Sequence, residues 1–197
     1  FDGTVGMDAA TAGQVELTAQ DLSPLLALTG QVMPDLPEGF GRDHVALTGE
    51  VRRAREGSLH LRDATLRLDD TILQVAADLV PGEVRPMLRG TITGGEVSLP
   101  GALSIDALTE AGWSQEILDV SALFNSDANL TVRVDSLALG GLMLGEVDLR
   151  ATVERGRLVF DIASIRAYEG QLAGQFVVNG RGGLSVGGDL RKSRKKK

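Results

Sequence analysis

Cysteine is absent from the 197-residue sequence, and only two histidines are present. The lack of cysteine excludes disulfide scaffolds, thiolate metal centres and cysteine nucleophiles. It leaves the redox compartment open, because cysteine-free chains suit the cytoplasm and the periplasm alike. His44 and His60 stand on separate predicted strands, and a metal site would need further ligands in a matching geometry. We therefore predict no metal site and interpret both histidines as surface or packing residues.

Aromatic residues and long apolar runs are also scarce. Five Phe, one Trp and one Tyr make up 4% of the chain, so Leu, Val and Ala carry its apolar character. No apolar run approaches the roughly 20 residues that a membrane-spanning helix requires, and no signal peptide is recognisable. We expect any membrane anchor of the parent protein to lie outside this sequence.

No arrangement of catalytic residues stands out. Asp69, Asp70 and Glu110 are isolated carboxylates, whereas a general acid–base pair must share one pocket. The Gly-rich stretch at 180–188 lacks phosphate-loop spacing and leads into a predicted strand rather than a helix. Four serines lack a Gly-x-Ser-x-Gly setting, namely Ser23, Ser98, Ser104 and Ser121. We therefore predict that the protein is not an enzyme and uses no cofactor.

What the sequence does contain is glycine, at 25 positions, and repeated two-residue alternation. Alternating segments bounded by Gly, Pro or Asp are typical of short strands joined by tight turns. Strands are predicted at 14–20, 44–53, 58–68, 71–79, 87–94, 128–139, 145–153, 157–167, 171–179 and 184–190. Short helices are expected at 21–30 and near 105–118. No linker divides the chain, so we expect residues 1–190 to form one mainly β unit, a curved antiparallel meander or open groove.

The sequence also repeats itself at an offset of 99 residues. Aligned without gaps, the segment that starts at Gly57 matches the segment that starts at Gly156. Each copy follows a Gly-Glu-Val triplet, at 49–51 and at 145–147. Such repetition is typical of a supersecondary unit that cannot bury its apolar face alone.

The alternation predicts a sheet with one apolar and one polar side. Val147, Leu149, Ala151 and Val153 alternate with charged or hydroxyl residues, as in antiparallel strands with one solvated face. An apolar face must be covered, and two short helices cannot cover about ten strands. A sandwich, a closed barrel and an open trough around an apolar guest would each solve this problem. An aliphatic lining poor in aromatics suits an ordinary core as well as an acyl chain.

Three stretches of the sequence carry a specific order of motifs. They are GWSQEILDVSAL at 112–123, GGLMLGEVDLRATVERGRLVFDI at 140–162 and AYEGQLAGQFVVNGRGGLSVGGDL at 167–190. This order resembles the C-terminal conserved region of bacterial AsmA-family proteins. Members carry a Tyr-x-Gly-x-Leu-x-Gly element after an alternating strand, which here is Tyr168, Gly170, Leu172 and Gly174. The similarity is best over 112–190, whereas upstream only the rhythm of the strands agrees.

The resemblance implies a protein anchored in the inner membrane by an N-terminal helix, with a β-rich body in the periplasm of Gram-negative bacteria. Related members form long curved sheets with a hydrophobic groove. They are implicated in moving phospholipid toward the outer membrane or in outer-membrane assembly. This sequence lacks the N-terminal anchor and ends in RKSRKKK where the strands of the family would continue. Both departures fit a fragment of a larger periplasmic body.

We therefore expect a non-enzymatic segment that serves outer-membrane biogenesis by holding phospholipid acyl chains in a hydrophobic β-groove for transport between membranes. Shielding an acyl chain from water is worth ~0.8 kcal/mol per CH₂ and needs no catalytic residue. The alternative is a structural or assembly scaffold of the envelope with a closed core and no lipid. The sequence does not identify any partner protein in the envelope. The candidate lining residues are Val132, Val134, Leu149, Val153, Phe160, Ile162, Phe176 and Val178.

The end of the chain is basic, whereas its body is acidic. Six of the 20 basic residues lie at 191–197, so 14 basic residues stand against 27 acidic ones in the rest. A basic tail can bind nucleic acid or phospholipid. However, no aromatic residue is interleaved with these charges, as single-strand binding requires. We expect no nucleic-acid partner and interpret residues 191–197 as a disordered or non-native tail.

Overall fold

The computed structural model describes residues 2–5, 11–21, 41–99, 121–139, 142–167, 170–181 and 185–194. These residues form twelve strands and one 3₁₀ helix, η1 (Ser121–Phe124). The first six strands are β1 (Asp2–Val5), β2 (Thr11–Ala19), β3 (Val45–Arg53), β4 (Leu59–Leu68), β5 (Thr71–Val80) and β6 (Met87–Leu99). The others are β7 (Asp127–Leu139), β8 (Leu142–Leu144), β9 (Val147–Glu154), β10 (Arg157–Ala167), β11 (Gly170–Asn179) and β12 (Ser185–Arg194).

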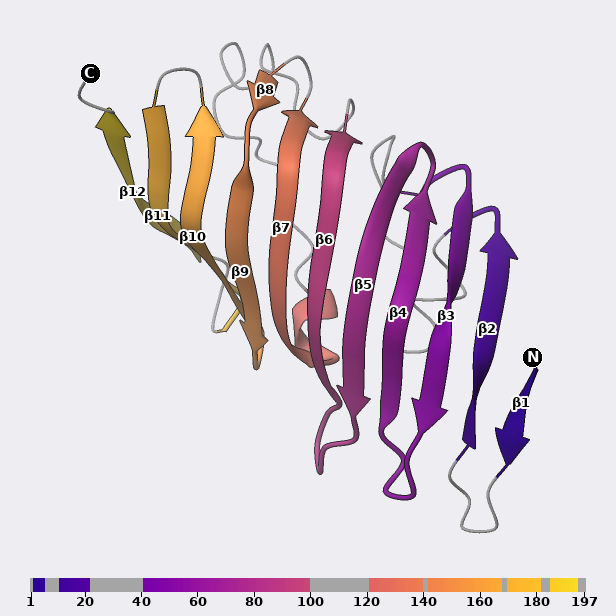
Figure 1. Ribbon diagram of the computed structural model, residues 1–197. Helices are drawn as coiled ribbons and strands as arrows, with labels where there is room; N and C mark the ends of the chain where they lie inside the picture. Colours follow the sequence, from indigo (N-terminus) through magenta and orange to yellow (C-terminus); the bar gives the residue numbers. More distant parts are fainter. Residues whose placement is uncertain are drawn as a thin grey trace.

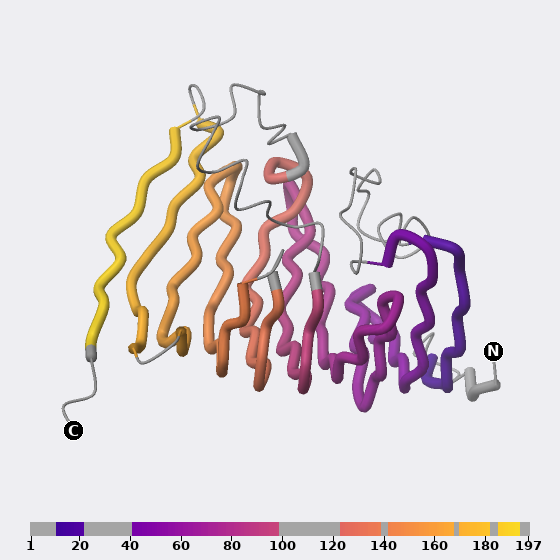
Figure 2. Tube along the Cα trace, turned by 90° about the horizontal axis from the view of Figure 1, so that it is seen from above, coloured from indigo at the N-terminus to yellow at the C-terminus, as the bar shows by residue number. Residues whose placement is uncertain are grey.

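The strands form one open, curved sheet. Their order across the sheet follows the chain from β1 to β12, except that the short β8 pairs with β7 beside this path. Figure 1 shows β1 and β12 at opposite ends of the sheet, and Figure 2 shows from above that β2 and β12 stay apart. The prediction of a mainly β, curved open sheet is confirmed. The described strands form neither a sandwich nor a closed barrel.

The sheet is predominantly antiparallel, as predicted, but one pair of neighbours is parallel. β6 and β7 run in the same direction, with Ile92 opposite Val132. The connection between two adjacent parallel strands must return along the length of a strand, which takes a dozen or more residues. Residues 100–126 separate β6 from β7 and provide that length. The helix expected near 105–118 lies in this connection and outside the described residues. Of the helix expected at 21–30, only the first residue is described.

Tight turns join several neighbouring strands. Asp69 and Asp70 alone separate β4 from β5, and Asp69 has a φ of 52°. Between β9 and β10, both Arg155 (φ 49°) and Gly156 (φ 81°) have positive φ. Two-residue hairpin turns whose twist matches the flanking strands require such values. The turn chemistry therefore places neighbours in the sequence beside each other in the sheet.

The 99-residue repeat coincides with equivalent structural elements. β5 covers residues 71–80 and β11 covers residues 170–179, so the two strands lie at that same offset. Gly57 and Gly156 each precede the first strand of a hairpin, and both have positive φ, 88° and 81°. The repeated sequence thus forms the same hairpin at two places in one sheet.

Irregular pairing keeps the apolar residues on one side of the sheet. The register shifts between Leu61 and Ala64 in β4, where Asp63 has a φ of 47°. It shifts again between Ile162 and Ile165 in β10. In a regular strand, two side chains that are three residues apart point to opposite sides of the sheet. A bulge inserts one extra residue, so that these two side chains point to the same side. Ala64 and Ile165 therefore keep the orientation of the apolar residues that precede them.

Residues 191–194 belong to the tail that was predicted to be disordered or non-native, and in the structure they are ordered. They continue β12 and pair with residues 170–173 of β11. The outer backbone groups of β11 need hydrogen-bond partners, and β12 provides them along its whole length. Charged side chains are compatible with this position, because edge strands commonly carry them. Residues 195–197 lie outside the described part of the chain.

Candidate functional site

The register assembles alternating residues of successive strands into rows, because paired residues point to the same side of a sheet. The central row consists of Val15, Gly49, Ala64, Val75, Ile92, Val132, Leu149, Ile162, Gly174 and Leu190. The row on one side of it consists of Leu17, Leu47, Leu66, Leu73, Gly94, Val134, Val147, Ile165, Leu172 and Lys192. The row on the other side consists of Gly13, Val51, Leu61, Ala77, Gly90, Leu130, Ala151, Phe160, Phe176 and Gly188. We call the side of the sheet that carries these three rows the apolar face.

The apolar face is continuous over ten strands. Neighbouring strands lie about 4.8 Å apart, so nine steps from β2 to β12 give a length of roughly 43 Å. Within the three rows the only charged residue is Lys192, at the far edge on β12. Most of these residues are half-buried.

All eight residues predicted to line a groove lie on the apolar face. Six of them are in the three rows, and Phe160 and Phe176 face each other with ring centroids 6.5 Å apart. The remaining two, Val153 and Val178, both pair with Leu158 in the adjacent row. The structure therefore brings together residues from β7, β9, β10 and β11 on one surface.

Sequence reasoning missed the contribution of the N-terminal half. Leu17, Leu47, Leu66 and Leu73 occupy the same row as Val134. Their strands were predicted from period-two alternation, which is the signal that marks them. However, alternation within one strand does not show whether its apolar side chains point to the same side of the sheet as those of the next strand. Turn lengths and the bulge at Asp63 decide that relation.

Part of the apolar face is packed as a core, and part of it is exposed. Val97, Val134 and Val147 form a buried cluster, against which Leu149 and Ile165 pack. On β12, by contrast, Val186 is 43% and Leu190 is 52% exposed. An apolar hollow of about 380 Å³ lies there, lined by Phe176, Val186, Gly187, Gly188 and Leu190. Apolar surface that could contact a guest thus remains at the C-terminal edge.

The opposite side of the sheet, the polar face, carries charged and polar side chains that pair across strands. Arg133 Nε donates to Asp148 Oδ2 at 3.1 Å, and Gln175 Nε2 donates to Asp161 Oδ1 at 2.6 Å. An open hollow of about 820 Å³ lies on this face, and both of these side-chain pairs and Arg150 line it. Because its acidic and basic side chains are mixed, the hollow presents no single sign of charge. The arrangement is typical of cross-strand pairing on a solvated sheet face.

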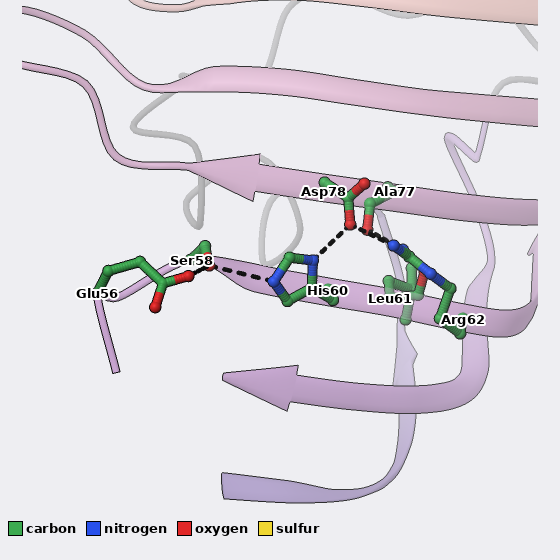
Figure 3. A network of polar contacts seen from close by, with 7 residues as sticks. All are labelled: Glu56, Ser58, His60, Leu61, Arg62, Ala77 and Asp78. Atoms are coloured by element: carbon green, nitrogen blue, oxygen red, sulfur yellow. Dashed lines mark hydrogen bonds and ion pairs between the residues drawn. The ribbon is translucent and has the colours of Figure 1, made fainter. Parts of the chain in front are cut away.

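A chain of polar contacts on β4 and β5 has the order of a catalytic triad (Figure 3). Ser58 Oγ lies 3.1 Å from His60 Nε2, and His60 Nδ1 lies 2.6 Å from Asp78 Oδ1. Arg62 donates to the same oxygen of Asp78 at 2.6 Å. The hydrogen bond from His60 is the main reason that the pKa of Asp78 is lowered; burial opposes it and the Arg62 contact adds to it.

The geometry of these residues does not suit nucleophilic catalysis. The hydroxyl of Ser58 donates to Glu56 Oε1 at 2.6 Å, so its proton points away from His60. A triad needs the reverse, with the serine proton directed to the histidine. Ser58 is also only 2% exposed, and a substrate carbonyl could not reach its oxygen. We interpret the cluster as a structural polar pairing that joins the start of β4 to the end of β5. His60 is thus a partly exposed residue that takes part in this polar pairing.

Sequence reasoning missed one Gly-x-Ser-x-Gly spacing, around Ser185. In the nucleophile elbow this motif stands between a strand and a helix. Ser185 is instead the exposed first residue of the edge strand β12 and pairs with Asn179. Both histidines lie in or beside β3 and β4, on the far side of β5 to β11. The spacing therefore has no catalytic partner among the described residues.

Asp69 is a structural residue rather than an isolated, solvated carboxylate. Its Oδ1 accepts the backbone N–H groups of Asp43 (3.0 Å) and His44 (2.9 Å), and its Oδ2 accepts those of Gly41 (2.9 Å) and Arg42 (3.3 Å). Burial acts to raise the pKa of Asp69, but the four hydrogen bonds outweigh it and lower the pKa. The carboxylate thus holds the entry to β3 against the β4–β5 turn.

The described residues contain neither a cluster of metal ligands nor a membrane-spanning helix. No group of three or more potential metal ligands is found among them. In the same part of the chain, no helix has the length and apolar character needed to span a bilayer. The residues Ser23, Ser104, Glu110 and Tyr168, which the sequence analysis singled out, lie outside it.

Comparison of the chain with family models, curated proteins and solved structures finds no match.

Proposed function

We propose that this chain is a periplasmic segment of an AsmA-like envelope protein, tethered to the inner membrane in its parent, that holds phospholipid acyl chains against the apolar face of its sheet. The observation that carries the proposal is the run of three adjacent rows without a charged residue from β2 to β11. Such a surface offers hydrocarbon a continuous path without directional contacts. The cellular role of the protein would be outer-membrane biogenesis through lipid transport between membranes.

Burial of apolar area would supply the free energy of binding. Each CH₂ group removed from water contributes ~0.8 kcal/mol, so even partial cover of a long acyl chain offsets the loss of chain freedom on binding. Aliphatic Leu, Val and Ile side chains suit such a guest because they contact it without requiring one orientation. The polar face, with its paired charges, keeps the other side of the sheet in water.

An envelope scaffold without lipid is the second candidate. The buried cluster of Val97, Val134 and Val147 favours it, because this part of the apolar face is already covered by neighbouring side chains. The two candidates differ in one measurable quantity, the amount of lipid that the protein retains. An enzymatic role has less support, since the Ser58 cluster has the wrong hydrogen-bond direction for nucleophilic attack.

A matched pair of substitutions on β9 tests the proposal. Ala151 lies on the apolar face, between Leu130 and Phe160, whereas the next residue, Thr152, lies on the polar face, opposite Asn129 and Val159. The 197-residue protein is purified, extracted with organic solvent and analysed for phospholipid by mass spectrometry. We expect lipid in the unmodified protein and in Thr152→Asp, and its loss in Ala151→Asp, because a carboxylate on the apolar face is costly to desolvate.

The circular dichroism spectra of both variants serve as the control for folding. An unmodified protein that carries no phospholipid and takes up no fluorescent fatty acid would contradict the proposal and support the lipid-free scaffold. Equal lipid content in folded Ala151→Asp and Thr152→Asp would show that lipid binds elsewhere than on the apolar face.

A further inference from the structure

The last strand combines exposed apolar side chains and a cation on one face. Register places Val186, Gly188, Leu190 and Lys192 on the apolar face, opposite Val178, Phe176, Gly174 and Leu172 of β11. Val186 and Leu190 are among the most exposed large apolar residues of the described chain, at 43% and 52%. They border the hollow of about 380 Å³ together with the ring of Phe176.

Val186, Gly188 and Leu190 form an apolar strip on β12, which we call the β12 strip, and Lys192 follows it on the same face. Within the described part of the chain, its ammonium group makes no ion pair and no hydrogen bond. Its stem crosses over Gly170, where Cε lies 3.3 Å from the position that a Cβ would occupy. On the apolar face its strand partner is Leu172, and the next residue in that row is Ile165. No carboxylate of the described rows faces Lys192 from this side.

Two other charges of β12, Asp189 and Arg191, lie on the polar face, whereas register places Arg194, opposite Gly170, on the same side as Lys192. Asp189 is opposite Gln175 and Arg191 is opposite Ala173. Arg191 donates to Asp189 at 3.4 Å, so the two charges offset each other. The positive charge on the apolar side of β12 is therefore not cancelled by Asp189.

We propose that the β12 strip holds one acyl chain of an anionic phospholipid whose phosphate is bound by Lys192. This inference rests on the proposed function, because it assumes that the apolar face accepts acyl chains. The four-residue step from Val186 to Leu190 spans about 13 Å, close to the ~15 Å that one leaflet contributes to the hydrocarbon core of a bilayer. A phosphate placed beyond Leu190 would then meet the ammonium group of Lys192. The length of the β12 strip suits one acyl chain. The charge of Lys192 favours an anionic lipid over an uncharged hydrocarbon.

A lipid-uptake assay with two kinds of vesicle tests this assignment. The 197-residue protein is incubated with phosphatidylcholine vesicles or with phosphatidylglycerol vesicles, the vesicles are removed by centrifugation, and lipid in the protein fraction is quantified. We expect the unmodified protein to take up phosphatidylglycerol in preference to phosphatidylcholine. Lys192→Gln should reduce that preference by about threefold to tenfold, the range for loss of one partly exposed charge-assisted contact. Leu190→Asp should reduce the uptake of both lipids.

Arg191→Gln is the matched control, because it removes the same charge from the adjacent residue on the opposite face. It should leave the lipid preference unchanged. Equal preferences in the unmodified protein and in Lys192→Gln would overturn the assignment of the phosphate site, even if lipid uptake persists. Failure of the proposed function is distinguishable, because then the unmodified protein would take up neither lipid. Protein that is removed with the vesicles, without lipid in the soluble fraction, would show surface adsorption and would also overturn the inference.

Discussion

Replacing Gly174 by alanine should weaken the attachment of β12 to the sheet. Gly174 has a φ of 149°, a conformation that residues with a side chain rarely adopt. A Cβ at this position would lie 2.0 Å from the carbonyl oxygen of Asp189 and 2.9 Å from Cα of Leu190. Both neighbouring atoms belong to the backbone of β12, so no side-chain rotation can relieve the contact.

Two terms set the size of the effect. Holding a non-glycine residue in such a backbone region costs about 1–3 kcal/mol. Moving β12 away breaks ladder hydrogen bonds near the Gly174–Leu190 pair, each worth about 1 kcal/mol net. We therefore expect the free energy that holds β12 to the sheet to fall by about 3 kcal/mol. Because β12 is an edge strand, it can separate from β11 while the rest of the sheet stays folded.

Hydrogen exchange followed by mass spectrometry measures this loss strand by strand, and urea unfolding followed by circular dichroism measures the whole sheet. Gly187→Ala is the control, because a Cβ on that β12 residue would meet no atom within 4 Å. Residues 185–194 should exchange faster in Gly174→Ala and at an unchanged rate in Gly187→Ala. If both variants exchanged and unfolded alike, the close backbone contact at Gly174 would not be a determinant of β12 pairing.

Two further predictions concern the turns. Gly156→Ala should lower the unfolding midpoint in urea more than Gly57→Ala. Both residues have positive φ, but a Cβ at Gly156 would lie 2.2 Å from the Phe124 ring, whereas at Gly57 the nearest atom is Pro81 Cγ at 3.5 Å; equal midpoints would contradict this reasoning. Since the pKa of Asp69 is lowered in the folded protein, its stabilisation should be complete above the unfolded-state value near 4 and lost as the pH falls through the folded value. Asp69→Asn should therefore destabilise the protein at pH 7 and make less difference at pH 2, and an equal loss at both pH values would count against the role of the charge.

The local pattern of the sequence was sufficient to predict most of the strands. Period-two alternation and Gly or Asp at turns are short-range signals, so ten strands could be predicted, with errors of up to five residues at their ends. The two missed strands, β1 and β8, have four and three residues, which is too short for alternation to be recognised. The same pattern correctly grouped Leu149 with Val153 and Phe160 with Ile162 within their own strands.

Relations between strands required the tertiary structure. Whether Leu66 shares a side with Val134 depends on every turn length and bulge between them, including the positive φ of Asp63. The sequence by itself determined an aromatic-poor, alternating β chain without cysteine. Only the fold decided that the alternating residues join into one face, that β6 and β7 run parallel, and that Lys192 ends an apolar strip. The physical reason is that side-chain parity is a local property within a strand, whereas its alignment across the sheet accumulates from contacts between distant residues.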